Sequence, residues 1–415
     1  MYEEIKNDFQ IKKFCMYGFF KNLKFFEPYL LLYLLSLGYN LFTIGSLIAF
    51  REVIVYLFEV PSGIIADHYG KKKELMMCFI FYIVSFVFFF IGSFYAVLFA
   101  MLFFGLGEAF RSGTHKAMII SYLEEKNWDS EKTFVYGRTR SFSLLGSAIS
   151  SLVSIILVLS IPNLRYLFLI AVIPYIADFL LIMSYPDSLD GASGKKINIK
   201  EFAALGLGHF KSLNNNMNLK NTIISSAVYD GIFRTIKDYI QPLILVLVMG
   251  SVITNLASFN QDEQSKIILG VMYFAFYMLS SQASKNIYRL TKKVSSDFLY
   301  SLSFIINALI CVFLVYFIKT SMIYAIMISF LFLYLLKDVR RPLFVEISSR
   351  YMKKSERATM LSIESQIRAI LMIIMGPLFG YIADSYSLEK LFTVLAIIYG
   401  VFYIYDRLIT RKATK

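Results

Sequence analysis

Long apolar segments, separated by short polar ones, recur along the whole 415-residue chain. Twelve of them can be counted, near residues 14–37, 44–66, 75–95, 97–122, 134–159, 164–185, 222–249, 267–286, 297–318, 321–347, 358–383 and 390–407. A helix of about 20 apolar residues crosses a hydrocarbon core of about 30 Å. Because a helix also satisfies its own backbone hydrogen bonds in lipid, the pattern predicts an all-α membrane protein with twelve transmembrane helices.

Basic residues gather in alternate loops between these segments. The formal net charge of +13 could indicate a nucleic-acid partner. The lysines and arginines lie between apolar segments, however, where they are typical of cytoplasmic loops. We therefore predict a multi-pass protein of the cytoplasmic (inner) membrane, with both termini in the cytoplasm, lipids around it and no nucleic-acid partner.

The longest polar stretch of the chain falls between the sixth and seventh segments and is rich in Gly, Ser, Asn and Lys. It divides the segments into two groups of six, and a short helix lying on the membrane surface is expected within it. The predicted divisions are an N-terminal half at 1–185, a cytoplasmic linker at 186–221 and a C-terminal half at 222–415.

The loop after the second segment carries a recognisable motif. It resembles the loop signature of the major facilitator superfamily (MFS), whose pattern is Gly-x-x-x-Asp-basic-x-Gly-basic-basic. The matching residues are Gly63, Asp67, Gly70, Lys71 and Lys72, and His68 stands where the family usually has Arg or Lys. The resemblance is greatest to bacterial drug-efflux-like members. It implies the MFS fold, in which two six-helix halves rock about a central substrate site.

Ionisable side chains are costly inside apolar helices and by default mark a substrate or ion pathway. Here they concentrate in the first, fourth, seventh and tenth segments, which in the MFS line the central cavity. The pathway candidates are Glu27, Glu108, Arg111, His115, Asp230, Arg234, Lys237, Asp238 and Gln241. Candidates for a cytoplasmic gate are Gly63, Asp67, His68, Gly70, Lys71, Lys72, Arg340 and Arg341.

Helical spacing groups these candidates. Positions 230, 234, 238 and 241 share one face of an uninterrupted helix, and so do positions 108, 111 and 115. Glu27 is the strongest single candidate for a proton site, because it is a carboxylate about halfway along an apolar segment and is followed by a proline.

Each cluster also has a structural interpretation. Glu108 with Arg111, and Asp230 with Arg234, can be ion pairs that fix helix packing. Glu364 and Arg368 lie one turn apart and are expected to pair in this way. Lys21 and Lys24 can extend toward the membrane surface, and His115 can be a packing residue.

Recognisable parts for other chemistry are missing from the sequence. Its three cysteines have no metal-ligand or disulfide spacing, and it has no phosphate-binding loop or nucleophile elbow. We therefore expect no enzyme activity, cofactor or metal. The chain is predicted to be a monomeric secondary transporter that moves a small polar or charged organic compound, with proton-coupled export as the first hypothesis. Uptake of a polar metabolite, or a lipid-handling or scaffold role without ion coupling, are the alternatives.

Overall fold

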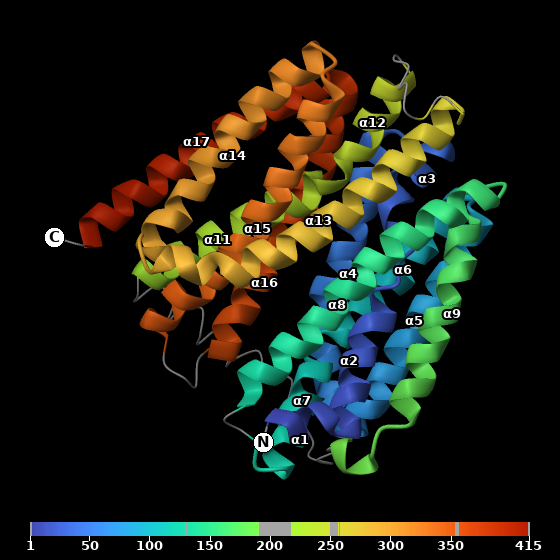
Figure 1. Ribbon diagram of the computed structural model, residues 1–415, viewed down its shortest axis with the longest axis vertical. Helices are drawn as coiled ribbons and strands as arrows, with labels where there is room; N and C mark the ends of the chain where they lie inside the picture. The colour runs from blue at the N-terminus through green and yellow to red at the C-terminus, as the bar shows by residue number, and fades with distance from the viewer. Residues whose placement is uncertain are drawn as a thin grey trace. The chain divides into compact units, whose positions relative to one another are not determined.

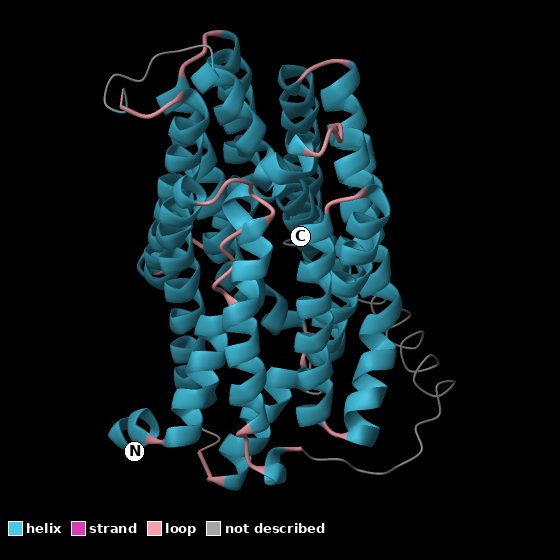
Figure 2. Cartoon of the chain, turned by 90° about the vertical axis from the view of Figure 1, so that its right-hand side faces the viewer, coloured by secondary structure: helices cyan, strands magenta, loops and turns pink. Residues whose placement is uncertain are grey.

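The computed structural model describes residues 2–128, 131–190, 217–249, 256, 258–352 and 357–413. Every regular element in these residues is a helix, as Figure 2 shows. Nine spans among them are long and apolar enough to cross a membrane, judged by length and composition. The predicted all-α membrane class is therefore confirmed.

The nine spans correspond to nine of the twelve predicted segments. The other three are the first, the seventh and the tenth, which are also the segments that carry many charges. The tenth forms one continuous helix, α15 (Ile323–Tyr351), whereas the first and the seventh are interrupted. The number of crossings thus stays a prediction, because the first and seventh segments are broken into shorter helices and charged residues lie along all three.

The chain forms two compact units, here called unit 1 and unit 2. Unit 1 comprises Met1–Leu37, Phe50–Ile197 and Lys266–Met278. Its helices are α1 (Tyr2–Asn7), α2 (Phe9–Lys21), α3 (Leu30–Ser36), α5 (Lys71–Ile91), α6 (Phe94–Arg111), α7 (Thr114–Glu125), α8 (Lys132–Ser160) and α9 (Tyr166–Met183). Helix α5 packs against α6 and α9, and α2 packs against α8 and α9 (Figure 1). Stacked rings such as Phe89 and Phe168, 4.6 Å apart, fill the space between them.

Unit 2 comprises Gly38–Ala49, Asn198–Ser265 and Leu279–Lys415. Its helices are α11 (Met217–Ile236), α12 (Ile240–Met249), α14 (Ser296–Lys319), α15, α16 (Arg357–Ser385) and α17 (Leu388–Ala413). Helix α14 packs against α15 and α17, and α11 packs against α15 and α16. Two long helices, α4 (Leu41–Tyr69) and α13 (Gln261–Thr291), contribute residues to both units.

The first turns of α4 pack against α16 within unit 2. A Cβ atom added to Gly45 would lie 2.2 Å from the carbonyl oxygen of Gly376, so the two backbones approach closely at this point. The Asp384 carboxylate of α16 caps the N-terminus of α4, because it accepts hydrogen bonds from the amides of Leu41 and Phe42 at 3.1 and 2.7 Å. A carboxylate at a helix N-terminus satisfies amides that have no partner within the helix. This contact was not predicted.

Most of the predicted linker, and with it the predicted surface helix, lies outside the described residues. The division of the chain at 185 and 222 therefore stays a prediction. The described start of the linker contains a single 3-10 turn, η3 (Asp187–Leu189), which belongs to unit 1.

Candidate functional site

Three of the predicted segments that carry charge are broken helices. In the first segment α2 ends at Lys21, and a 3-10 turn, η1 (Glu27–Tyr29), precedes α3. In the fourth, α6 ends at Arg111 and α7 begins after Gly113, whose φ of +83° is a left-handed conformation that favours glycine. In the seventh, the 3-10 turn η4 (Lys237–Tyr239) separates α11 from α12. Several pathway candidates therefore lie at interruptions, where backbone groups are released from the helical hydrogen-bond pattern.

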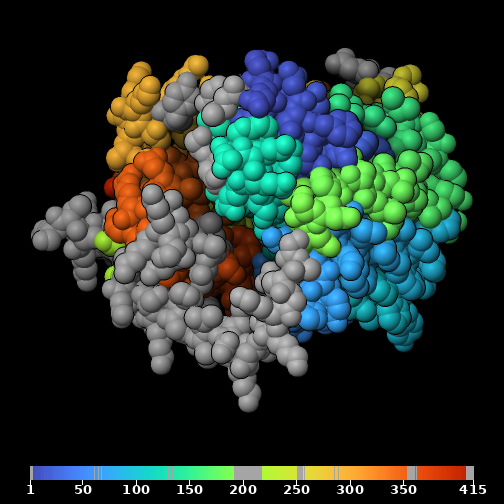
Figure 3. Space-filling view, turned by 90° about the horizontal axis from the view of Figure 1, so that it is seen from below, coloured from blue at the N-terminus to red at the C-terminus, as the bar shows by residue number. Residues whose placement is uncertain are grey.

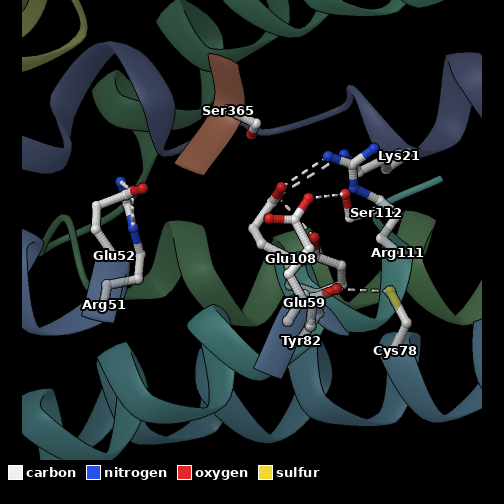
Figure 4. Close-up of polar contacts among 12 residues, drawn as sticks. Lys21, Arg51, Glu52, Glu59, Cys78, Tyr82, Glu108, Arg111, Ser112 and Ser365 are labelled. Atoms are coloured by element: carbon white, nitrogen blue, oxygen red, sulfur yellow. Dashed lines mark hydrogen bonds and ion pairs between the residues drawn. The ribbon is translucent and has the colours of Figure 1, made fainter. Parts of the chain in front are cut away.

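Glu108 is the centre of the polar network in unit 1 (Figure 4). Its Oε2 accepts a hydrogen bond from Arg111 Nη2 at 2.7 Å, and its Oε1 accepts one from the Tyr82 hydroxyl at 2.6 Å. Lys21 Nζ lies 3.8 Å from the same Oε1. One carboxylate thus meets two cations and a hydroxyl, from α2, α5 and α6.

The burial of this network is uneven. The Lys21 side chain is 9% exposed, whereas those of Glu108 and Arg111 are 23% and 32% exposed. Lys21 therefore contacts Glu108 on the side away from solvent, and Arg111 contacts it on the more exposed side. An ion pair of this kind exchanges partners more readily than a fully enclosed one.

Gly107 explains how Tyr82 reaches Glu108. A Cβ atom at Gly107 would lie 2.9 Å from the Tyr82 ring, so a larger residue would displace that ring. The adjacent helix α5 contributes a second contact, since Cys78 Sγ lies 3.1 Å from the Gly107 carbonyl oxygen and donates to it. Gly107 thus makes room for the Tyr82 side chain that binds Glu108, whereas Gly105 lets α6 approach α4 at Arg51 and Ile54.

Further side chains form hydrogen bonds around the helix interruption between α6 and α7. Ser112 donates a hydrogen bond to Glu59 Oε1 at 2.7 Å, and Ser62 donates to the Ala109 carbonyl at 3.0 Å. On the other side of the break, Thr114 donates to Glu74. Residues from α4 and α5 therefore hold the interruption, which is a built feature of unit 1.

Lys24 and Arg51 add positive charge near the same network. Lys24 Nζ and the Arg51 guanidinium each lie 5.7 Å from the centre of the Phe104 ring, a cation–π distance. Arg51 also pairs with Glu52 at 2.6 Å. Lys24 therefore contacts an interior aromatic ring of unit 1.

His115 lies in an aromatic enclosure, apart from the face predicted for it. Because α6 ends at Arg111, His115 belongs to α7 and does not continue the face of Glu108. Its ring stacks on Tyr17 with centres 3.6 Å apart, and its Nε2 lies 3.4 Å from the Tyr185 hydroxyl. These contacts favour the packing interpretation.

Glu27 begins η1 and does not lie within a continuous helix. Its backbone amide donates to the Lys24 carbonyl at 2.9 Å, and its side chain is half-buried. The predicted helix is thus interrupted beside this carboxylate. Its role as a proton site stays a prediction.

The pathway candidates of unit 2 lie on three successive elements, and their sharing one face stays a prediction. Asp230 and Arg234 lie one turn apart on α11, but Asp238 belongs to η4 and Gln241 to α12. No ion pair joins Asp230 and Arg234 among the described side chains. Lys237 instead pairs with its neighbour Asp238 at 2.9 Å, and Gln241 is fully buried.

Arg340 occupies an aromatic box inside unit 2. Its guanidinium lies 4.4, 3.5 and 4.3 Å from the centres of the Tyr229, Tyr300 and Phe304 rings. It donates to the Tyr300 carbonyl at 2.6 Å and to the Ser225 hydroxyl at 2.9 Å, and only 2% of the residue is exposed. It therefore joins α11, α14 and α15, and its predicted part in a gate stays a prediction.

Arg341 points to a different partner. Its Nη1 lies 3.3 Å from Glu364 Oε2, and the same carboxylate accepts from Arg368 Nη1 at 2.9 Å. The predicted pair of Glu364 and Arg368, both on α16, is therefore confirmed. Arg341 of α15 binds the same carboxylate.

The basic loop motif is anchored by a residue outside it. The Lys72 amide donates to Asp190 Oδ1 at 2.8 Å, and the Lys71 amide donates to the Asp190 carbonyl at 2.9 Å. Gly70, with a φ of +106°, leaves no room for a Cβ atom beside that carboxylate. Asp190 thus caps the start of α5. Figure 3 shows the end of α9 (light green) beside the start of α5 (blue).

Lys72 also reaches the turn after α9 with its side chain. It donates to Asp187 Oδ1 at 2.7 Å and to the Tyr185 carbonyl at 2.9 Å. The hydrogen bond from Lys72 to Asp187, together with the lysine charge, lowers the pKa of the exposed Asp187 carboxyl. The loop is therefore a latch between α5 and the end of α9.

The other motif residues make fewer contacts in the described part of the structure. A Cβ atom at Gly63 would meet no atom of the described residues within 4 Å, so no close helix approach is seen among them at this glycine. The His68 ring is exposed and lies edge-on to Tyr69, 4.6 Å away. The Asp67 side chain lies outside the described part of the structure.

Sequence reasoning missed two acidic residues that the structure makes prominent. Asp190 follows the sixth apolar segment, and nothing in its surroundings in the sequence marks it as a helix cap. Asp178 lies inside the apolar helix α9, so the rule that singled out the other buried charges applies to it as well. In the described ranges, no three His, Cys, Asp or Glu side chains are grouped as metal ligands.

Comparison with known proteins identifies relatives along most of the chain. A family model described as "Major Facilitator Superfamily" matches residues 14–363. The uncharacterized MFS-type transporter YxaM of Bacillus subtilis (strain 168) is 23% identical over 390 residues, which cover 90% of this chain and 88% of that protein.

Solved structures of transporters share the fold at low sequence identity. A mutant of the nucleoside transporter NupG has a TM-score of 0.75 and 14% identity, covering 98% of this chain and 99% of the other. A POT family transporter in complex with 5-aminolevulinic acid has a TM-score of 0.73 and 13% identity, with coverages of 98% and 95%. A D-xylose-proton symporter has a TM-score of 0.68 and 11% identity, and both coverages are 95%.

Proposed function

Because the chain belongs to the Major Facilitator Superfamily, we propose that it is a secondary active transporter coupled to protons. It moves a small polar or charged organic compound across the cytoplasmic membrane by alternating access. In this proposal it works as a monomer with both termini in the cytoplasm. The observation that carries the proposal is the network of Lys21, Glu108 and Arg111 beside a broken helix in unit 1.

The mixed charge of this network supports a polar substrate. Glu108 and Arg111 are opposite in sign, 2.7 Å apart and partly exposed. A substrate with a carboxylate or an ammonium group can replace one partner in such a pair, whereas an apolar substrate has no group that can compensate either charge. A zwitterionic or otherwise charged compound fits both members.

The same network supports proton coupling. When Glu108 takes up a proton, it loses its negative charge and its hold on both cations. Arg111 and Lys21 are then released at the end of α6 and the end of α2, each at a helix interruption. One protonation event thus changes the contacts of two broken helices, which is what coupling a proton to a conformational change requires.

Export is the proposed direction, on the basis of the loop pattern shared with drug-efflux-like members. Uptake with protons is the second candidate, because one protein with this fold is named as a D-xylose-proton symporter. The two differ in the sign of coupling, so a single measurement separates them.

A two-step experiment tests the proposal. Thermal-shift screening of the purified protein against metabolites and drugs, at two pH values, first identifies a ligand. Flux of that ligand is then measured in proteoliposomes with an imposed pH gradient. Export by exchange for protons predicts accumulation inside vesicles with an acidic lumen, and symport predicts accumulation when the outside is acidic.

Variants connect the flux to the network. Glu108→Gln should abolish the response to the pH gradient while ligand exchange at equal pH continues. Glu4→Gln, an exposed carboxylate on α1, is the matched control and should behave as the wild type. Flux that ignores the gradient in the wild type would refute proton coupling, and the absence of ligand flux would favour the lipid-handling or scaffold alternative.

A further inference from the structure

Asp178 is a buried acidic residue in the middle of α9. None of its surface is exposed, and neither of its carboxyl oxygens has a hydrogen-bond partner among the described residues. An ionised carboxylate without donors in a protein interior is strongly disfavoured, so such a group either carries a proton or pairs with a cation. The neutral acid is the form that these surroundings accommodate.

The face of α9 that carries Asp178 lies against the end of α2. Tyr175, one turn before it, donates its hydroxyl to the Lys21 carbonyl at 3.1 Å. Lys21 is the charged side chain that acts electrostatically on Asp178. The buried Tyr17 hydroxyl on α2 also lies within electrostatic range and lacks a hydrogen-bond partner in the described residues.

The remaining surroundings of Asp178 contain few groups that titrate. The stretch of α8 from 141 to 160 has no ionisable side chain. Among the described residues, the titratable groups that interact with Asp178 are Lys21 and Tyr17 of α2, Tyr175 of α9, and Tyr185 just beyond α9. Cys15 of α2 and Cys78 and Tyr82 of α5 interact in turn with these tyrosines. Lys21 is thus the cation that can serve Asp178.

Lys21 also serves Glu108, at 3.8 Å. Its ammonium group therefore lies beside Glu108 and within electrostatic range of Asp178, and these are two carboxyl groups of different kinds. Glu108 is partly exposed and already holds Arg111, whereas Asp178 is enclosed and unpartnered. Only one of the two can be the main partner of the ammonium group at a time.

We propose that Asp178 is a second proton-binding site, linked to Glu108 through Lys21. In the structure described, Asp178 holds a proton and Lys21 pairs with Glu108. When Arg111 leaves Glu108, the Lys21 ammonium gives a proton to the Glu108 carboxylate, and the resulting amine takes the proton of Asp178. Asp178 is then an anion paired with the restored Lys21 ammonium, Glu108 is neutral, and no net charge has moved into the unit.

This inference rests on the proposed proton coupling and extends it to a residue outside the Glu108 network. In this proposal Asp178 stores a proton at a site that is shielded from water. The partly exposed Glu108 is the group that exchanges protons with the solvent.

Infrared spectroscopy of the protein in lipid tests the proposal without a substrate. Isotopically labelled aspartate shifts the carbonyl band of protonated aspartates away from that of glutamates. The wild type at neutral pH should show a labelled band of a protonated aspartate. Asp178→Asn should lose it, and Glu4→Gln, the exposed control, should keep it.

Two further variants test the link through Lys21. Glu108→Gln removes the competing carboxylate, so Lys21 turns to Asp178 and the labelled band should disappear at neutral pH. Lys21→Met combined with Glu108→Gln should restore the band, because Asp178 then has no cation. Lys21→Met alone should keep the band to higher pH than the wild type. It serves as the test if Asp178→Asn does not yield folded protein.

Three results would overturn the proposal. They are a labelled band that survives Asp178→Asn, a band that Glu108→Gln leaves unchanged, and a double variant that lacks the band. Failure of the transport proposal is distinguishable, because it shows in the vesicle flux and leaves the protonation state of Asp178 as found.

Discussion

Substitution of Arg340 should loosen unit 2 and leave unit 1 unchanged. Its guanidinium connects three helices through hydrogen bonds to Tyr300 and Ser225 and through three aromatic rings, with 2% of the residue exposed. Ala at this position would leave a cavity the size of a long side chain. The described part of the structure provides no carboxylate for Arg340, so its positive charge is held by carbonyls, hydroxyls and rings.

The magnitude follows from opposing contributions. Truncating a long buried side chain to Ala costs about 2–5 kcal/mol, and a desolvated cation–π contact contributes about 2 kcal/mol. Removing the charge, on the other hand, recovers the cost of having taken it out of water. We therefore expect Arg340→Ala to lower the free energy of unfolding by about 2–5 kcal/mol. A loss of 2 kcal/mol already changes the folded-to-unfolded ratio about 30-fold.

Two other variants separate packing from charge. Arg340→Met fills much of the same volume without a charge, and we expect a loss below about 1.5 kcal/mol. Arg340→Lys keeps a buried charge but loses the planar fork and the stacking on the rings. Its loss should therefore lie between those of the Met and Ala variants.

The chain contains its own reporters for each unit. Its three cysteines are free and buried, Cys15 and Cys78 in unit 1 and Cys311 in unit 2. Background variants that keep only Cys311 or only Cys78 report the opening of one unit through the rate at which a thiol reagent labels the protein. The Arg340 variants should accelerate labelling of Cys311 and leave that of Cys78 unchanged.

The ranking of the variants decides the outcome. If Arg340→Lys is the best tolerated of the three, the positive charge itself matters and the packing argument is wrong. A loss below about 1 kcal/mol for Arg340→Ala, typical of a surface position, would refute it as well. Equal acceleration at Cys78 would show that the effect is not confined to unit 2.

Two further predictions concern backbone contacts. Gly45→Ala should lower the stability of unit 2 by about 1–3 kcal/mol, because the new Cβ would lie 2.2 Å from the Gly376 carbonyl oxygen. Gly400→Ala is the control: its Cβ would meet no atom of the described residues within 4 Å, so Cys311 labelling should be unchanged or slower. Asp190→Ala should remove the cap of α5 at a cost of about 1 kcal/mol and speed hydrogen exchange in the first turn of that helix, with α6 as the internal reference; unchanged exchange at the start of α5 would contradict the latch.

The sequence determined the class of the protein and the helices that carry its charges. Hydropathy is a local property of the chain, so the apolar segments could be counted and the fold class predicted without knowing which helices are neighbours. The cost of a charge in lipid is equally local, and it led to Glu108 and Arg111, which the structure pairs. The loop motif from Gly63 to Lys72 likewise indicated the family before any contact was known.

The tertiary structure decided where the charged helices break and what their side chains meet. Helical periodicity assumes an unbroken helix, so it put His115 on the face of Glu108, although α6 ends at Arg111 and His115 stacks on Tyr17. The difference between Glu108, which has three partners, and Asp178, which has none among the described residues, is not written in either residue's neighbourhood in the chain. It depends on which side chains neighbouring helices bring within about 3–4 Å, and only packing fixes those distances.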